Sequence, residues 1–401
     1  MVPLPYTSLM SYTLSADQAE ALKLIGTWYK KRSAPYLTLG GYAGTGKTTL
    51  IAYLRQALRQ YDEDTRVAFC AFTGKATRVL DGRLREQKVP RRGDSVSTIH
   101  ALIYNAQTDK SGTVTGWRKR DELDYDLIIV DEASMVDETI WKDLLSFEIP
   151  ILAVGDHGQL PPINSSFNLM ASPQLRLERI WRQEETSPII EVATLARMTG
   201  QIPIKDYGSG VVKLDRSDAS SGQTVQDMLE NYSSDLLVLC GYNKTRIKLN
   251  QAIRGYRDYL SPEPASGDYV VCLRNDRKRK LYNGMTGTIA YLTAAEDDPE
   301  RLWYYASIGF ENEDNSYNGY IWRAQFDNPE TVSQLPMAPD KKPGNLFDFG
   351  YALTVHKAQG SQARKVLLFE ERFGKMSEDD WRRWLYTAVT RATEELIIVG
   401  N

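Results

Sequence analysis

Cysteine and histidine are scarce in this chain of 401 residues, which contains three of each. The cysteines Cys70, Cys240 and Cys272 stand far apart in apolar, strand-like runs and show no CxxC spacing. A disulfide framework or a zinc site would need such ligands grouped at short spacing. We therefore expect buried, reduced thiols, which suit a cytoplasmic protein, and no zinc centre.

Long apolar runs and a strong charge imbalance are also missing. No segment approaches the roughly 18 apolar residues of a membrane helix, and the first ten residues do not resemble a secretory signal. The net charge of −3, from 49 basic and 52 acidic residues, argues against coating a polyanion over the whole surface, although one local groove can still be basic. A chain of this length is expected to form two or more domains.

The chain does contain a phosphate-binding loop. Residues 41–48 read Gly-Tyr-Ala-Gly-Thr-Gly-Lys-Thr and fit the GxxxxGK[ST] template in full. A β-prone run at 36–39 precedes the loop and a helical apolar spacing at 49–58 follows it, so backbone N–H groups and the helix N-terminus would face the phosphates. This setting disfavours an ordinary glycine-rich turn and predicts nucleotide binding. The predicted nucleotide-binding residues here are Gly41, Gly44, Thr45, Gly46, Lys47, Thr48 and Thr49.

Acidic and polar residues follow two further apolar runs. The run 127–130 ends in Asp131, placed to hold Mg²⁺ with the Thr48 hydroxyl, and in Glu132, which can polarise an attacking water. The run 151–154 is followed by Gly-Asp-His-Gly-Gln-Leu-Pro-Pro, in which Gln159 could sense the γ-phosphate. Lys47 would contact the β- and γ-phosphates. These patterns predict an ATPase that uses Mg²⁺ and no other metal.

The order of strand-like and helical runs predicts an α/β fold. Buried strands are expected at 67–72, 127–130 and 151–154, then at 236–239 and 395–399 in a second α/β set that begins near Trp181. Two segments interrupt this order. A small β-hairpin is expected at 104–117, and a small β-barrel is expected from the strand-like runs 269–273, 286–292, 303–310 and 320–326.

Taken in order, the motifs resemble those of RecD-type (RecD/Dda-like) superfamily 1 helicases. The matching segments are 14–18, 71–76, 98–100, 131–134, 155–162, 181–183, 351–362 and 386–392. The resemblance implies two RecA-like parallel-sheet lobes with ATP between them. Its implied domains are lobe 1A at 1–102 and 124–180, a β-hairpin pin at 103–123, lobe 2A at 181–266 and 346–401, and an SH3-like barrel at 267–345.

The resemblance also assigns residues outside the phosphate-binding loop. Arg182 and Arg391 match the arginine-finger positions, which act with Lys47, Asp131, Glu132 and Gln159 in catalysis. Gln18 matches a glutamine that reads adenine. Trp181 matches a position where an aromatic ring often packs on adenine, although a tryptophan of the hydrophobic core is an equal alternative. Gln359 and Gly360 belong to the implied nucleotide-binding residues. The implied contacts to the DNA strand are Phe72, Thr73, Lys75, Thr98, His100, Thr354, His356 and Lys357.

The implied activity is ATP-dependent translocation from 5′ to 3′ on single-stranded DNA, with unwinding of duplex at junctions. The implied protein is a monomeric motor in the cytoplasm of a bacterial or phage-infected cell, acting in DNA replication, repair or recombination. Two alternatives stay open. One is an RNA helicase of the same superfamily, because sequence does not show whether a 2′-hydroxyl is tolerated. The other is an ATP-switched DNA-binding or remodelling factor without processive unwinding, because the expected pin is short.

Overall fold

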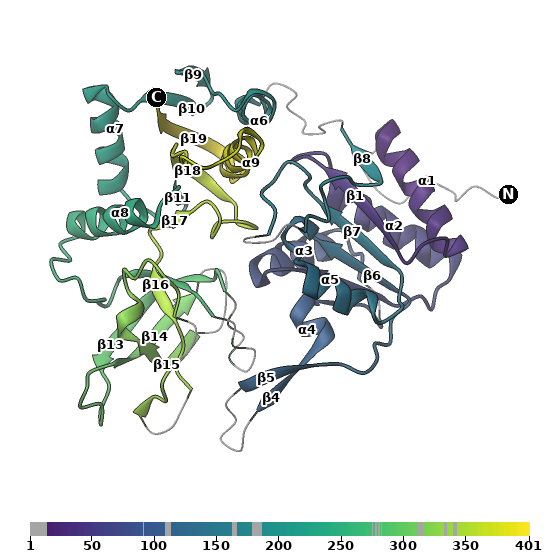
Figure 1. The fold of residues 1–401 in the computed structure, drawn as a ribbon, viewed down its shortest axis with the longest axis horizontal. Helices are drawn as coiled ribbons and strands as arrows, with labels where there is room; N and C mark the ends of the chain where they lie inside the picture. The colour runs from purple at the N-terminus through teal and green to yellow at the C-terminus, as the bar shows by residue number, and fades with distance from the viewer. Residues whose placement is uncertain are drawn as a thin grey trace. The chain divides into compact units, whose positions relative to one another are not determined.

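The chain forms two compact units, residues 1–107 with 116–185, and residues 108–115 with 186–401 (Figure 1). Each unit is described by itself. The computed structural model describes residues 14–90, 92–108, 114–162, 167–178, 187–274, 276, 279, 281, 283–310, 316–332, 335–339 and 343–401.

The first unit is built on a six-stranded parallel sheet in the order β3-β2-β6-β7-β1-β8. Because all neighbours run parallel, the carboxyl ends of the strands share one edge of the sheet. The predicted strands are confirmed, with small shifts at their ends. The strands are β1 (Tyr36–Gly41), β2 (Val67–Ala71), β3 (Ser95–Thr98), β6 (Leu127–Asp131), β7 (Ile151–Gly155) and β8 (Leu175–Leu177).

Alternate residues of these strands face two separate cores, one on each side of the sheet. In β6, Leu127 and Ile129 join one core while Ile128 and Val130 join the other. The first core is covered by α1 (Ala16–Lys31), α2 (Lys47–Tyr61) and α3 (Gly74–Glu86), and the second by α4 (Ile99–Ile103) and α5 (Glu138–Leu145). Strands buried on both faces explain the uninterrupted apolar runs in the sequence.

The predicted hairpin is confirmed as a two-stranded sheet of β4 (Tyr104–Thr108) and β5 (Val114–Lys119). It follows α4 directly. Just after β5, Arg120 N donates a hydrogen bond to Ile103 O at 2.8 Å, which joins the two ends of the hairpin. The hairpin therefore leaves and rejoins the first unit at a single point.

The second unit also contains a six-stranded sheet, in the order β17-β11-β18-β19-β10-β9, parallel except for the β9–β10 pair. Its strands are β9 (Lys205–Gly208), β10 (Val211–Asp215), β11 (Leu236–Cys240), β17 (Ala352–Thr354), β18 (Ala363–Phe369) and β19 (Ala392–Gly400). In Figure 1, α7 (Ala219–Glu230) and α8 (Asn243–Tyr256) lie on one side of this sheet, and α6 (Pro188–Thr199) and α9 (Glu378–Val389) on the other. The predicted pair of parallel α/β lobes is thus confirmed.

A five-stranded antiparallel sheet, β15-β14-β13-β12-β16, interrupts this second lobe. Its strands are β12 (Tyr269–Cys272), β13 (Thr286–Ala294), β14 (Trp303–Phe310), β15 (Ser316–Trp322) and β16 (Phe347–Phe349). The strand expected at 320–326 was wrong at both ends. It begins earlier, and Arg323–Gln325 form a 3₁₀ turn because Arg323 pairs with Glu263 and the Gln325 amide binds backbone groups of Glu330 and Val332.

All three cysteines are buried and unbridged, as predicted. Burial raises the pKa of each thiol, to about 12 for Cys272, so these groups are chemically inert. Of the helices that the structure describes, none has the length and apolar character that crossing a membrane requires.

Candidate functional site

The phosphate-binding loop joins β1 to α2 in a tightly folded conformation. Gly44 and Gly46 adopt φ angles of 81° and 77°, a region that side chains with a Cβ rarely enter. The Thr45 amide and hydroxyl both donate to the Tyr42 carbonyl, at 3.3 and 2.9 Å. No side chain caps the N-terminus of α2, so the first turn presents its N–H groups and the positive end of its dipole toward the loop.

Lys47 lies across this loop. Its Nζ donates to the carbonyl oxygens of Gly41, at 2.7 Å, and Tyr42, at 3.0 Å. Each contact is a hydrogen bond to a neutral carbonyl. A hydrogen bond from Lys47 to a phosphate oxygen would be stronger, because both partners would then be charged. The lysine is therefore held at the loop in a position from which it can transfer to a phosphate.

The paired acids end β6, beside β2 and β7 in the sheet. Glu132 has a φ of 51° and turns the chain sharply after the strand. Its N–H donates to Asp131 Oδ1 at 2.9 Å. Burial raises the pKa of the Asp131 carboxyl, while the Glu132 N–H and the charges of Lys47 and Arg83 lower it. Asp131 therefore lies within electrostatic reach of Lys47.

Arg83, near the end of α3, is a site residue that the sequence analysis did not select. Its Nη1 donates to Thr48 Oγ1 at 3.3 Å, and its charge acts on Asp131. It thus contacts one predicted magnesium ligand and acts electrostatically on the other. No motif in the sequence marks this arginine, since its place depends on how α3 packs beside α2.

The loop after β7 packs against the phosphate-binding loop. The rings of Tyr42 and His157 lie 4.2 Å apart between centroids. Within the loop, Asp156 accepts from Gly158 N at 2.9 Å and from Gln159 Nε2 at 3.3 Å. Gln159 is buried and hydrogen-bonded to Asp156. To act as the predicted phosphate sensor, it would have to exchange this hydrogen bond for one to the γ-phosphate.

Gln18 braces the phosphate-binding loop from α1. Its Nε2 donates to Thr45 O at 3.0 Å, and its Oε1 accepts from Ser15 N at 3.0 Å as part of a capping box. A Cβ on Gly46 would lie 2.4 Å from Gln18 Nε2, so the glycine is needed for this approach as well as for its φ. The predicted contact of Gln18 with adenine stays a prediction.

The predicted DNA-binding residues of the first unit follow β2 and β3, whose ends pair at Ala71 and Thr98. Thr73 and Thr98 cap α3 and α4, accepting backbone N–H groups at 3.1 and 3.2 Å. Phe72 and His100 have ring centroids 6.3 Å apart. His100 in turn lies 5.5 Å from the ring of Tyr104, which the sequence analysis placed in the hairpin only. Lys75 follows in the first turn of α3.

In the second unit, Arg391 follows α9 and is buried. Its guanidinium donates to Thr387 O at 2.9 Å, Ser361 O at 3.0 Å and Thr390 Oγ1 at 3.2 Å. The Ser361 contact brings Arg391 beside the turn that contains Gln359 and Gly360, where Gly360 has a φ of 74°. These three predicted nucleotide-site residues are therefore neighbours within this unit.

Thr354, His356 and Lys357 end β17 and begin the same turn. Burial lowers the pKa of His356. The pKa of Lys357 is lowered by burial and, to a smaller extent, by the charge of Arg246. The charge of Asp348 raises it in part. The remaining predicted site residues, Trp181 and Arg182, lie outside the described residues.

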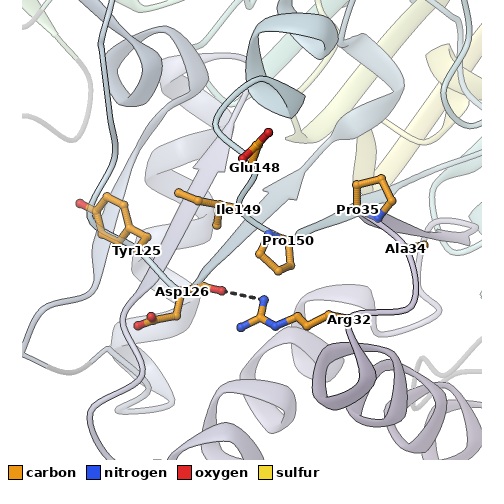
Figure 2. A pocket seen from close by; sticks show the side chains of 8 residues that line it. All are labelled: Arg32, Ala34, Pro35, Tyr125, Asp126, Glu148, Ile149 and Pro150. Atoms are coloured by element: carbon orange, nitrogen blue, oxygen red, sulfur yellow. Dashed lines mark hydrogen bonds between the residues drawn. The ribbon is translucent and has the colours of Figure 1, made fainter.

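A hollow of about 460 Å³ lies in the first unit, away from these groups. Figure 2 shows Arg32 reaching across it to the Asp126 carbonyl, at 3.2 Å. Pro35, Asp126 and Pro150 precede β1, β6 and β7, so the hollow adjoins the amino edge of the sheet. Ligands of open parallel sheets bind at the opposite, carboxyl edge. The hollow is therefore not where a nucleotide is expected, and the phosphate-binding loop stays the predicted site.

Comparisons with known proteins agree with this geometry. The sequence matches the AAA domain family over residues 13–213 and the UvrD-like helicase C-terminal domain over residues 349–399. The chain is similar to the ATP-dependent RecD2 DNA helicase of Deinococcus radiodurans, with 29% identity over 91% of this chain and 47% of that protein. The RecBCD enzyme subunit RecD of Buchnera aphidicola is 33% identical, over 90% of this chain and 69% of the subunit.

A solved structure also shares the fold. A Pif1 helicase from Bacteroides, in complex with ADP-AlF3 and ssDNA, aligns with a TM-score of 0.53 and 18% identity, over 98% of this chain and 93% of that one. The chain spans about half of the Deinococcus relative and about two thirds of the Buchnera one. On the matched domains and on the identity to the Buchnera subunit, the chain belongs to the RecD-like superfamily 1 helicases.

Proposed function

We propose that this chain is an ATP-dependent DNA helicase that translocates from 5′ to 3′ on single-stranded DNA and unwinds duplex. The observation that carries the proposal is the order of groups along the carboxyl edge of the first sheet. The phosphate-binding loop follows β1, the paired acids follow β6, and the aromatic and basic candidates for DNA follow β2 and β3. We infer that a nucleotide site and a strand-binding surface share this sheet.

The oxygen ligands at this edge fit Mg²⁺. Thr48 offers a hydroxyl and Asp131 a carboxylate, the hard donors that Mg²⁺ prefers. Bound Mg²⁺ would neutralise charge on the phosphate oxygens. Lys47 would bind the β- and γ-phosphates. Glu132 would accept the proton of the attacking water, and the products would be ADP and phosphate.

Single-stranded DNA is the proposed track, bound without regard to sequence. Phe72 and His100 present neighbouring rings on which a base can stack, and Lys75 and Lys357 supply charge for phosphates. We extend the proposal to binding at single-strand–duplex junctions, with β4–β5 as the separating pin and residues 267–345 as an SH3-like barrel. A monomeric motor, and arginine-finger roles for Arg182 and Arg391, complete it.

The decisive experiment compares strand displacement on duplexes with a 5′ tail and with a 3′ tail, alongside the ATPase rate with and without DNA. We expect displacement from the 5′ tail only and ATP turnover that depends on DNA. Glu132→Gln serves as the matched variant, since it keeps the size of the side chain but removes the base. It should bind ATP with unchanged affinity and lose hydrolysis and displacement together.

The results also separate the two alternatives. Equal stimulation of ATP turnover by matched RNA and DNA oligonucleotides would favour an RNA motor. DNA-stimulated turnover without displacement from either tail would favour a remodelling factor. Displacement from the 3′ tail alone, or full hydrolysis by Glu132→Gln, would contradict the proposal itself.

A further inference from the structure

Arg83 lies at the edge of the phosphate site that the two oxygen ligands share. It is the tenth residue of α3, so at about 1.5 Å per residue it stands roughly 15 Å along the helix from the Thr73 cap. Its exposed side chain reaches back to α2 and donates to Thr48 Oγ1 at 3.3 Å. The arginine two residues later behaves differently. Arg85 pairs at 2.8 Å with Asp81 of its own helix.

The place of the guanidinium conflicts with a divalent cation. Magnesium takes oxygen ligands at about 2.0–2.1 Å in a nearly ideal octahedron. A cation bound at Thr48 Oγ1 would put two like charges on one hydroxyl, with a guanidinium nitrogen only 3.3 Å from that oxygen. Because the arginine is exposed and on a long stem, it can turn away into solvent or toward a phosphate without disturbing the core.

We propose that Arg83 is a positioning residue that occupies the magnesium side of the phosphate site until the magnesium–nucleotide complex displaces it. In the absence of Mg²⁺, Arg83 provides at Thr48 and Asp131 the positive charge that the metal ion would otherwise supply. It therefore supports binding of metal-free ATP and competes with Mg²⁺ for its ligands. The inference deepens the proposed function, on which it rests.

The measured quantity is the ratio of two dissociation constants for a fluorescent, non-hydrolysable ATP analogue. One is measured in excess EDTA and the other in saturating Mg²⁺, with the full chain in both. Arg83→Gln should bind the metal-free analogue more weakly and the magnesium complex as well as the unaltered protein does. The ratio should rise by up to about fivefold, the upper end of the range of a single exposed charge contact.

Two further variants control the measurement. Arg85→Gln removes the same charge from the same helix and should leave the ratio unchanged. Arg83→Lys keeps the charge and should restore most of the original ratio. As a second readout, the Mg²⁺ concentration that gives half-maximal ATP turnover should fall in Arg83→Gln by a similar factor, because the competing cation is gone.

Each outcome decides one point. An unchanged ratio in Arg83→Gln, or a ratio change that Arg85→Gln matches, would overturn the inference. So would equal losses of affinity with and without Mg²⁺, because Arg83 would then be an ordinary phosphate ligand. Failure of the unaltered chain to bind the magnesium complex would count against the proposed function, which the variants of Arg83 do not test.

Discussion

Two cations at the phosphate-binding loop of the first unit lie within reach of a ligand, whereas two arginines of the second unit are buried and paired where its sheets join. Lys47 contacts only loop carbonyls, and the Arg83 side chain is exposed. In contrast, Arg246 and Arg254 of α8 are almost fully buried and pair with Asp348 and Asp268 at 2.8 and 2.9 Å. The first unit also has a buried pair, Arg55 with Asp94 at 2.9 Å, so the contrast concerns the phosphate-binding loop and the sheet junction and not the two lobes as wholes.

The buried pairs of the second unit hold together the points where its two sheets join. Arg254 binds Asp268, just before β12, and Asp348 lies in β16, where the five-stranded sheet ends. Between the two arginines on α8, Asn250 accepts from Ala352 N at 2.8 Å, at the start of β17. Both crossings into the inserted sheet are thus fixed to one helix face.

Lys47→Ala should produce the largest change in activity. Losing one charged donor aimed at the transferred phosphate typically costs about 10²–10³ in rate, so ATP turnover should fall by at least that factor. Stability should change little, since Lys47 hydrogen-bonds only loop carbonyls, and each such bond contributes about 1 kcal/mol net. DNA-stimulated ATPase rates and urea unfolding measure the two effects on the same preparation.

If Lys47 serves a ligand and not the fold, its loss should lower ATP turnover without lowering stability. Lys47→Arg keeps the charge but not the compact ammonium, so it should be as stable as the unaltered protein and hydrolyse ATP poorly. If Lys47→Ala unfolds the first unit, its lysine is structural in the same way as the arginines of the second unit. Lys47 and the buried arginines would then not differ in role.

Asp348→Ala should produce the largest change in stability. It leaves Arg246 buried without its carboxylate partner and removes the acceptor for Asp327 N, at 2.9 Å, and Phe349 N, at 2.8 Å. Breaking one partner of a buried pair costs about 3–5 kcal/mol. Urea unfolding gives the loss, and amide hydrogen exchange should place it in α8 and β16.

A surface ion pair of the same unit supplies the control. Arg364 and Glu394 pair at 2.9 Å with side chains 61% and 51% exposed, so Arg364→Gln should change stability by no more than about 0.5 kcal/mol. Equal losses from Asp348→Ala and Arg364→Gln would mean that the buried pair does not fix the junction. A double variant, Arg246→Met with Asp348→Leu, should recover much of the loss, because no uncompensated charge remains.

The features that the sequence predicted well are set by residues adjacent to one another along the chain. The loop around Gly44 and Gly46 needs a local backbone conformation, and the strand 127–131 needs only an apolar run that ends in acids, so both could be recognised directly. The pairing of Arg246 with Asp348 joins residues 102 apart, and Arg83 meets Thr48 through helix packing. Neither partner is encoded by spacing. The end of β15 was misplaced for the same reason, because the contact of Arg323 with Glu263 is not local.

Lys357 offers the smallest expected effect and joins the two uses of charge, since it is a partly buried cation proposed to bind DNA. Its pKa is lowered by burial and then by Arg246, so the folded protein binds fewer protons than the unfolded chain at pH values below the ordinary 10.5. Stability therefore rises with pH through that window. A DNA phosphate favours the charged form, so affinity should fall as the pH rises through the same window, earlier than for an exposed lysine.

Fluorescence anisotropy with a labelled single strand, between about pH 7 and 10, measures this dependence. Lys357→Arg should flatten the pH profile, because arginine stays charged throughout this range. The expected difference is a few-fold, since Lys357 is one phosphate contact among several. His356, whose pKa burial lowers from 6.5, is neutral in this range and should add no slope. Identical profiles for the unaltered protein and Lys357→Arg would show that Lys357 does not contact the strand, and would place its buried charge with the structural pairs around α8.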